Sequence, residues 1–221
     1  YAGRNYNDII FIGGNRVGTG YFRNVGNTQR VGTEFALNGQ LGKKWTWFTN
    51  YAYVRATFET SQMISSVGHP HNTFDDDDFD DNVLREQYQI PIGNGDEIPG
   101  ISPHVGRFGL GYSPLKNWTI NLDVEANSAQ LFRGDENNAS GLEVPGYFLF
   151  NARTEYNFSL GEKFRDDANA TFFLVARNIT DENYRTGGLF GENEVSGTGG
   201  GSVFATPGMP TTIFAGMNVT W

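Results

Sequence analysis

The residues from Thr211 to Trp221, TTIFAGMNVTW, constrain the fold more than any other stretch of the chain. Apolar side chains alternate there with polar or small ones, which gives an extended strand one apolar face and one polar face. The apolar face holds Ile213, Ala215, Met217, Val219 and Trp221. Only Phe214 breaks the pattern. A strand of this kind, closed by an aromatic residue, is typical of an outer-membrane barrel, where one face meets lipid and the ring lies at the membrane boundary.

The same period-two alternation recurs along the chain, and no sustained helical period competes with it. The separation of apolar from polar residues is complete in Trp118–Asn127. About eight strands are predicted in this way: Asp8–Ile12, Glu34–Leu41, Trp45–Phe58, Gly106–Tyr112, Trp118–Asn127, Tyr147–Phe158, Ala170–Ile179 and the final strand. Two of them, Trp45–Phe58 and Ala170–Ile179, carry apolar residues on both faces.

The connections between these strands alternate in length. Three are short, at residues 41–44, 113–117 and 160–168. Four are long and rich in Gly, Asn, Asp and Pro, at residues 13–24, 60–103, 132–145 and 184–210. Short turns at one end and long loops at the other are the layout of an outer-membrane barrel. The sequence therefore predicts an all-β, antiparallel transmembrane β-barrel.

Composition excludes several other classes of protein. With 38% hydrophobic residues, the chain has no apolar run of the length that a transmembrane helix needs. The formal net charge of −9 argues against a nucleic-acid partner. The chain has no cysteine, and no nucleophile stands beside a base in a catalytic motif, so we expect no enzyme activity and no cofactor. The first residues do not form an export signal, and we expect that signal to lie upstream or to have been removed.

Four segments resemble the C-terminal barrel of TonB-dependent outer-membrane receptors. The clearest is FLVARNITDENY, which is similar to the penultimate strand of that family. Its motif residues are Asn178, Ile179, Thr180, Asp181 and Tyr184. The other three segments span residues 24–41, 98–112 and 207–221. We assign this motif a structural role, because Asn and Asp side chains bond back to the backbone and initiate turns.

The resemblance implies a place in a larger protein. Barrels of this family have about 22 strands, so the whole chain, residues 1–221, would be roughly the last eight, without the plug domain, TonB box and signal peptide. The implied function is active uptake of a scarce ligand, such as a ferric siderophore, haem, cobalamin or an oligosaccharide. The implied location is the bacterial outer membrane. The implied partners are outer-membrane lipid, the TonB–ExbB–ExbD complex through the missing region, the barrel-assembly machinery that would recognise Trp221, and a small ligand.

Two alternatives stay open at this point. Eight strands are enough to close a small barrel, so the chain could be a complete outer-membrane barrel with a structural or adhesin role. It could also be a soluble β-barrel that binds a ligand, with its apolar face turned inward.

Candidate ligand-binding residues lie in the long loops. The segment from His69 to Asp81 holds six Asp and two His in thirteen residues. Carboxylates there could bind a cation, or the loop could simply be solvated and self-repelling. The candidates for ligand contact are His69, His71, Phe74 and Phe190, and those for a cation are Asp75, Asp76, Asp77 and Asp78.

A second group of candidates faces the interior of the barrel. Strand alternation places Arg107, Asp123, Glu125, Arg153 and Glu155 on the polar side. We expect these residues to line the lumen. They would contact a plug or a passing ligand, or form ordinary cross-strand charge pairs.

Overall fold

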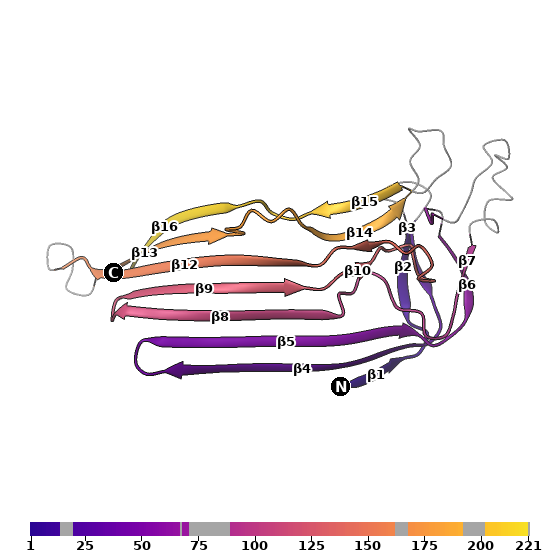
Figure 1. Cartoon of the computed structure of the whole chain (residues 1–221), viewed down its shortest axis with the longest axis horizontal. Helices are drawn as coiled ribbons and strands as arrows, with labels where there is room; N and C mark the ends of the chain where they lie inside the picture. The colour runs from indigo at the N-terminus through magenta and orange to yellow at the C-terminus, as the bar shows by residue number, and fades with distance from the viewer. Residues whose placement is uncertain (14–19, 67, 71–88, 162–167, 192–201, 221) are drawn as a thin grey trace.

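The computed structural model describes residues 1–13, 20–66, 68–70, 89–161, 168–191 and 202–220 (Figure 1). Within these residues every regular element is a β-strand. Eight strands form one antiparallel sheet, which we call the wall. The wall strands are β1 (Ala2–Asn5), β4 (Thr28–Leu41), β5 (Trp45–Phe58), β8 (His104–Leu115), β9 (Trp118–Asn127), β12 (Tyr147–Ser159), β13 (Asn169–Arg177) and β16 (Thr212–Thr220).

The other eight strands pair into ribbons of two at one end of the wall. The pairs are β2 (Ile9–Gly13) with β3 (Gly20–Asn24), β6 (Gln62–Ser65) with β7 (Gln89–Ile92), β10 (Gln130–Leu131) with β11 (Glu143–Val144), and β14 (Arg185–Gly191) with β15 (Ser202–Pro207). Each ribbon lies within one of the long connections, and together we call these connections the loop layer. The short turns between β4 and β5 and between β8 and β9 lie at the opposite end (Figure 1).

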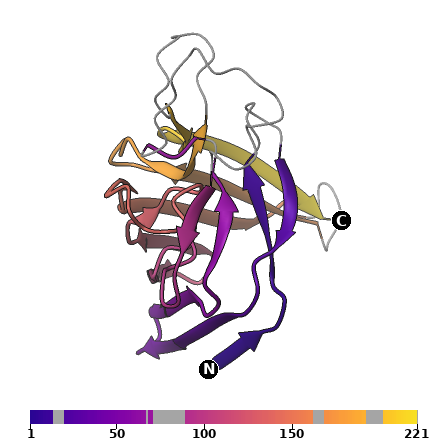
Figure 2. The same ribbon diagram turned by 90° about the vertical axis from the view of Figure 1, so that its right-hand side faces the viewer.

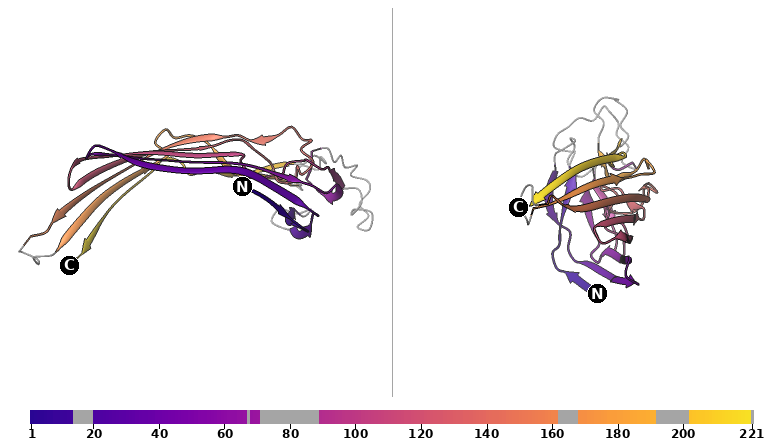
Figure 3. Two further views of the ribbon diagram at one scale, coloured as in Figure 1. Left: turned by 90° about the horizontal axis from the view of Figure 1, so that it is seen from below. Right: turned by 90° about the vertical axis from the view of Figure 1, so that its left-hand side faces the viewer.

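The wall is an open, curved sheet (Figure 3). Its strands follow the order β1-β4-β5-β8-β9-β12-β13-β16, so β1 and β16 are its edges within the described residues. A complete eight-strand barrel would pair those two edges. The structure therefore shows a section of a barrel wall and not the closed small barrel that was the first alternative.

Cross-strand register gives the wall two chemically different faces. Arg107 lies opposite Glu125 on one face, whereas Phe35 lies opposite Tyr51 on the other. The second, apolar face leaves large hydrophobic side chains exposed along every long strand: Phe35, Leu37, Trp45, Phe108, Trp118, Leu122, Phe148, Phe150, Tyr156, Phe172, Leu174, Ile213 and Met217. Surfaces of this size are rare in water-soluble monomers. They are exposed in the described residues, whereas the soluble-barrel alternative would bury them in its interior.

Phenylalanines on the polar face explain the two irregular strands and the misplaced Phe214. Each of three rings lies beneath an arginine guanidinium. The pairs, with distances from guanidinium carbon to ring centroid, are Arg107–Phe48 (5.7 Å), Arg153–Phe173 (5.5 Å) and Arg177–Phe214 (5.6 Å). Two of the rings also cover a cross-strand glycine, because a Cβ at Gly109 or Gly216 would overlap the Phe48 or Phe173 ring. Each of these three rings on the polar face is thus covered by a cation.

The first predicted strand is misplaced. Asp8–Ile12 was expected in the sheet, but Ile9–Gly13 forms β2 of a loop-layer ribbon, and the edge of the wall is β1. The reason is burial: Ile12 is 2% exposed and packs in a cluster with Val25 and Phe58. The four residues of β1, AGRN, carry no apolar alternation that could have revealed them.

The loop layer has hydrophobic clusters of its own. The larger contains Ile12, Val25, Phe58, Ile64, Ile90 and Ile92, and the smaller contains Phe132, Val144 and Phe190. Figure 2, a view onto this end of the molecule, shows the ribbons gathered beside the ends of the wall strands. Phe58 belongs to β5 of the wall and is fully buried, so the larger cluster fixes the ribbons to the sheet.

Candidate functional site

The polar face of the wall collects the five residues that the sequence placed in the lumen. Arg107 lies opposite Glu125, and Asp123 lies opposite Asn151. The remaining two, Arg153 and Glu155, lie on β12 of the same face, opposite Asn121 and Thr119. Strand register alone therefore brings these charges together, as expected for alternating side chains.

Ion pairs neutralise part of this charge. The Arg107 Nη2 and Nε donate to Asp123 Oδ2 over 3.1 and 3.3 Å. Asn151 Nδ2 donates to the same oxygen over 3.0 Å. Arg153 likewise pairs with Glu155. The two arginine side chains are about half exposed, so each pair adds little to stability. Their effect is to hold the polar groups in place along the face.

A shallow pocket of about 410 Å³ opens beside Arg107. Glu34, Asn50 and Glu125 contribute its polar groups, and the small side chains of Ala36 and Ala52 leave the space between them. Two carboxylates, an amide and a guanidinium can together hold a polar or cationic group through hydrogen bonds. The described residues that line the pocket include no pairing of a nucleophile with a base.

Asn178, the first residue of the family-like motif, closes the turn after β13. The residue is only 2% exposed.

 The backbone φ of Asn178 is +49°, in the left-handed region that asparagine tolerates better than most residues. Asn178 Nδ2 donates to the carbonyl oxygens of Glu182 and Met209, each over 2.9 Å, and Oδ1 accepts from the Glu182 N–H. One side chain therefore satisfies the backbone of two segments at the point where the strand leaves the sheet.

The rest of the motif fastens the start of β16. Asp181 Oδ1 accepts from the N–H and the hydroxyl of Thr211, and Thr211 Oγ1 also donates to the Asn178 carbonyl over 2.7 Å. The Met209 N–H donates to the Tyr184 hydroxyl over 3.2 Å. The Tyr184 ring also packs 4.5 Å from that of Tyr147, centroid to centroid. These contacts join β13 and β16 across a long connection, which is a structural role.

A hydrogen-bonded chain connects this motif with the polar face. The Asn178 N–H donates to Asn151 Oδ1 over 3.0 Å, and Asn151 donates in turn to Asp123. Asp123 also accepts from Arg107, so the chain crosses three wall strands. Sequence reasoning missed Asn151. Its position on the polar face of a predicted strand was visible, but its partners were not.

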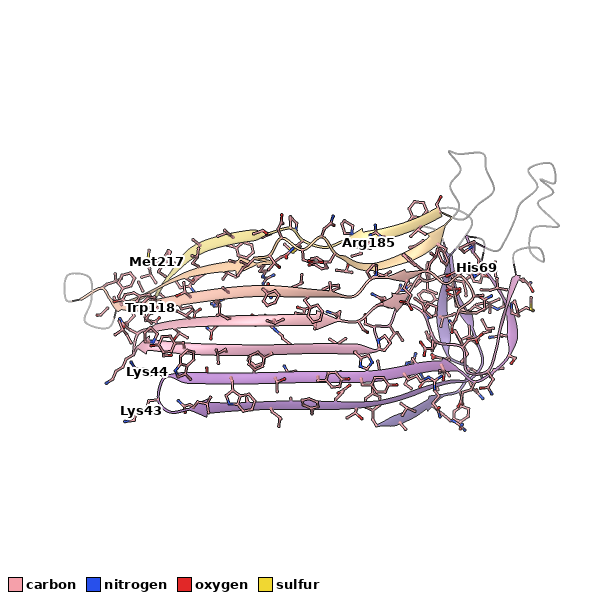
Figure 4. The ribbon with its side chains drawn as sticks, viewed as in Figure 1. Lys43, Lys44, His69, Trp118, Arg185 and Met217 are labelled. Atoms are coloured by element: carbon pink, nitrogen blue, oxygen red, sulfur yellow. The ribbon has the colours of Figure 1, made fainter. Side chains whose placement is uncertain are left out.

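A buried polar cluster lies in the loop layer. His69 Nε2 and Asp135 Oδ1 are 3.1 Å apart, and both side chains are 0% exposed. Figure 4 labels His69 at this end of the molecule. The Phe190 ring meets the His69 ring edge-on at 5.9 Å and stacks on Phe132 at 5.4 Å. Ser140 donates its hydroxyl and its N–H to Asp135. Residues from three long connections therefore meet at one buried point.

The pKa values of the two carboxyl groups in this cluster, Asp135 and Glu136, are shifted in opposite directions. Burial alone would raise the pKa of Asp135, but hydrogen bonds from His69 and Ser140 outweigh it and lower the pKa below its ordinary value. Burial raises the pKa of Glu136 to about 6, although the Gly134 N–H donates to its carboxylate over 3.0 Å. Glu136 therefore resists ionisation while Asp135 favours it.

The structure locates some of the predicted loop residues and not others. His69 and Phe190 come together, but both are buried, and they present almost no surface to an approaching ligand. His71, Phe74, the four aspartates at 75–78 and Trp221 lie outside the described residues. In the part of the chain that is described, no group of three or more His, Cys, Asp or Glu could hold a metal ion. Sequence reasoning missed Asp135 and Glu136, because nothing local indicates their distant partners.

Comparison with known proteins identifies the family. A family model described as TonB dependent receptor-like, beta-barrel, matches residues 3–179. The chain belongs to this family. The TonB-dependent receptor family consists of outer-membrane receptors and transporters, and the wall described above is a section of its barrel.

Solved structures show the same fold. The siderophore receptor PiuA from Acinetobacter baumannii superposes with a TM-score of 0.64 at 17% identity, covering 99% of this chain and 25% of that one. The copper transporter OprC superposes with a TM-score of 0.60 at 16% identity, covering 99% of this chain and 27% of that one. The ferric citrate transporter FecA superposes with a TM-score of 0.55 at 21% identity, covering 88% of this chain and 24% of that one. The chain thus spans about a quarter of the length of these structures. Among the described residues, no helix is long and apolar enough to span a membrane.

Proposed function

We propose that this chain forms part of the barrel wall and loop layer of an outer-membrane transporter that takes up a scarce ligand by a TonB-dependent mechanism. The observation that carries the proposal is the open sheet with opposite faces. Its apolar face exposes large hydrophobic side chains, and its polar face carries paired charges. An open sheet in lipid would leave unpaired backbone groups at β1 and β16, which further strands must satisfy. The described sheet therefore suits a section of a larger closed barrel of about 22 strands.

The neighbouring structures suggest a class of cargo. PiuA is a siderophore receptor, FecA transports ferric citrate and OprC transports copper. We extend this to a metal chelate as the first ligand to test, with haem, cobalamin and oligosaccharides after it. The cargo is a substrate in this proposal, and no resident cofactor takes part.

The polar face supplies the interior surface of the proposed transporter. Arg107, Asp123, Glu125, Arg153 and Glu155 would face a plug domain contributed by another part of the protein, or a ligand in passage. The pocket formed by Glu34, Asn50 and Glu125 offers acceptors to a cationic or hydrogen-bonding group from either. Opening of the path would be driven by the TonB–ExbB–ExbD complex, and assembly would depend on the barrel-assembly machinery with Trp221 as its signal.

The loop layer would capture the ligand on the extracellular side. The buried pair of His69 with Asp135, packed against Phe190, would act on the ligand indirectly by holding three loops together. Direct contacts would fall to His71 and Phe74, and a cation, if one binds, to the aspartates at 75–78. These roles are part of the proposal.

Two measurements on one preparation test this function. Outer membranes are extracted with detergent, and the protein that contains this sequence is identified by its mass and peptides. We expect a heat-modifiable band far above 24.5 kDa, with peptides beyond this sequence. Uptake of ⁵⁵Fe supplied as ferric citrate and as a set of ferric siderophores should disappear when TonB is inactivated. A mature protein near 24.5 kDa, or one that stays soluble without detergent, would overturn the proposal.

A further inference from the structure

Among the described residues, lysine occurs only at the turn end of the molecule. The chain has only four lysines, and all of them stand in the short connections: Lys43, Lys44, Lys116 and Lys163. Lys43 and Lys44 lie in the turn between β4 and β5, and Lys116 lies in the turn between β8 and β9. Lys163 is outside the described residues. Figure 4 shows Lys43 and Lys44 at the turn end with Trp118, far from His69 at the loop end.

Hydrogen bonds join the two described turns into one edge. The Ser113 N–H donates to the Lys44 carbonyl over 2.7 Å, and Lys44 Nζ donates to the Pro114 carbonyl over 3.1 Å. An ammonium group has three donors, so Lys44 keeps two for another partner. Lys43 and Lys116 are exposed. We call Lys43, Lys44 and Lys116 the lysine rim.

The two described turns that form the lysine rim contain no acidic residue. Residues 42–44 and 113–117 read GKK and SPLKN, without Asp or Glu. At the loop end, by contrast, arginines of the wall strands pair with acids of the neighbouring connections: Arg4 with Glu59, Arg30 with Asp8 and Arg55 with Glu97. A row of cations without local counter-charges is complementary to an anionic surface.

An aromatic and aliphatic surface lies directly beside the rim on the apolar face. Trp45 stacks on Tyr112 with ring centroids 4.3 Å apart. Trp118 donates its indole N–H to Thr154 over 2.8 Å, which fixes the ring while leaving it 37% exposed. Leu41 and Leu115, 62% and 54% exposed, complete this surface. Tryptophan and tyrosine in this setting mark the level of lipid headgroups.

We propose that the lysine rim binds the headgroups of anionic glycerophospholipids in the membrane leaflet at the turn end. The ammonium groups would donate to phosphate oxygens, and the acyl chains would lie on Trp45, Tyr112 and Trp118. The exposed aromatic and leucine surface points to lipid as the source of the phosphate, because a free phosphate ion makes no use of it. This inference rests on the proposed function, since it requires the wall to lie in a membrane.

The test uses the native protein that carries this chain, reconstituted in nanodiscs with phosphatidylglycerol and phosphatidylcholine in equal amounts. Lipids that stay bound on release are counted by native mass spectrometry. We expect wild type to retain phosphatidylglycerol preferentially. The triple variant Lys43→Gln, Lys44→Gln, Lys116→Gln should lose that preference, by about fivefold for each lysine at low salt. Added salt should weaken retention by wild type through screening, whereas inorganic phosphate should leave it unchanged.

Two further variants serve as controls. Lys43→Arg, Lys44→Arg, Lys116→Arg keeps the charge and should keep most of the preference. Arg133→Gln with Arg185→Gln removes two exposed cations at the loop end and should change nothing. If the triple glutamine variant does not fold, Lys116→Gln alone should still lose about fivefold. Equal retention of both lipids by wild type, or unchanged preference in a folded glutamine variant, would overturn the inference. Failure of the proposed function would look different, because wild type itself would not be recovered from membranes.

Discussion

The wall and the loop layer bury their apolar side chains in opposite ways. In the wall, large residues such as Leu122 and Phe148 are 52% and 63% exposed, and the charges lie on the other face of the sheet. In the loop layer, Val25 and Ile64 are fully buried, as in a soluble domain. The wall therefore depends on surrounding lipid to cover its apolar face, whereas the loop layer carries its own core into water.

This difference separates what each region can do. In the wall, strand register sets the position of each side chain. The pairing of the strands therefore determines which residues lie together on the polar face. The loop layer positions side chains by packing and by buried hydrogen bonds such as that between His69 and Asp135. A change in the core of the loop layer should therefore alter the loops, and a change on the apolar face should alter insertion in the membrane.

The largest effect is expected at the junction between the two regions. Phe58→Ala removes a fully buried ring from the larger loop cluster, and truncations of this kind cost about 3–5 kcal/mol. Amides of β6 and β7 should exchange hydrogen much faster while the wall stays heat-modifiable. Phe150→Ala, on the half-exposed apolar face, is the matched control and should leave loop exchange unchanged. Equal effects of both changes would mean that the regions do not differ.

The next test introduces a charge on each face of the wall in turn. Leu122→Arg places a charge on the apolar face of β9, which should cost about 2–4 kcal/mol near the membrane midplane. Its neighbour Asn121 points to the polar face, so Asn121→Arg should cost far less. The measurement is denaturant unfolding in lipid vesicles. A loss of stability that is the same for both arginines would contradict the assignment of the faces.

A pH-dependent test addresses the loop layer alone. The folded pKa of Glu136 is raised to about 6, so the stability that its protonated form supports is fully present below its ordinary pKa and is lost as pH rises through 6. The loss amounts to about 2 kcal/mol. Glu136→Gln should remove this dependence, and exchange of the Gly134 and Ser140 amides should report it.

Asp135 provides the check on that result. Its pKa is lowered, so its contribution is present above its ordinary pKa and is lost only as pH falls through the lower folded value. The change in stability between pH 4.5 and about 6 is therefore expected to come from Glu136. Unchanged pH dependence in Glu136→Gln would mean that another group titrates there.

The smallest expected effect concerns the polar face. Phe48→Leu removes the ring beneath the Arg107 guanidinium and should cost about 0.5–1 kcal/mol, because the pair is largely exposed. Phe48→Trp keeps a ring in that place and should cost less. Unfolding in lipid vesicles can rank the two variants. A larger loss in Phe48→Trp would show that the ring only fills space above Gly109.

The sequence sufficed for most of the wall because alternation is a local signal. Trp118–Asn127 was predicted with the bounds that β9 has, and the residues expected in the lumen share one face. Two strands could not be placed from this alternation. The edge strand β1 is short and polar, and β2 is an apolar run whose place depends on Phe58, far along the chain.

The loop layer was hardly predictable for the same physical reason. His69 was chosen as a ligand contact from its place in a long polar loop, but its position is set by Asp135, 66 residues away. The polar string around Asp135 predicts a turn and says nothing about the distant partner. Asn178 and Asp181 were easier, because their bonds to nearby backbone follow from local turn chemistry.

The central claim is that the wall spans a membrane with its two faces in different surroundings. This chain has no cysteine of its own. Single cysteines are placed from Trp118 to Asn127 in the native protein, with any cysteine outside this chain replaced, and are spin-labelled. Access of oxygen and of a water-soluble nickel complex is then measured in lipid vesicles. The account predicts a period of two, with labels at 120, 122 and 124 open to oxygen and shielded from nickel, and the opposite at 121, 123 and 125. Equal access along the strand, or the reversed pattern, would contradict it.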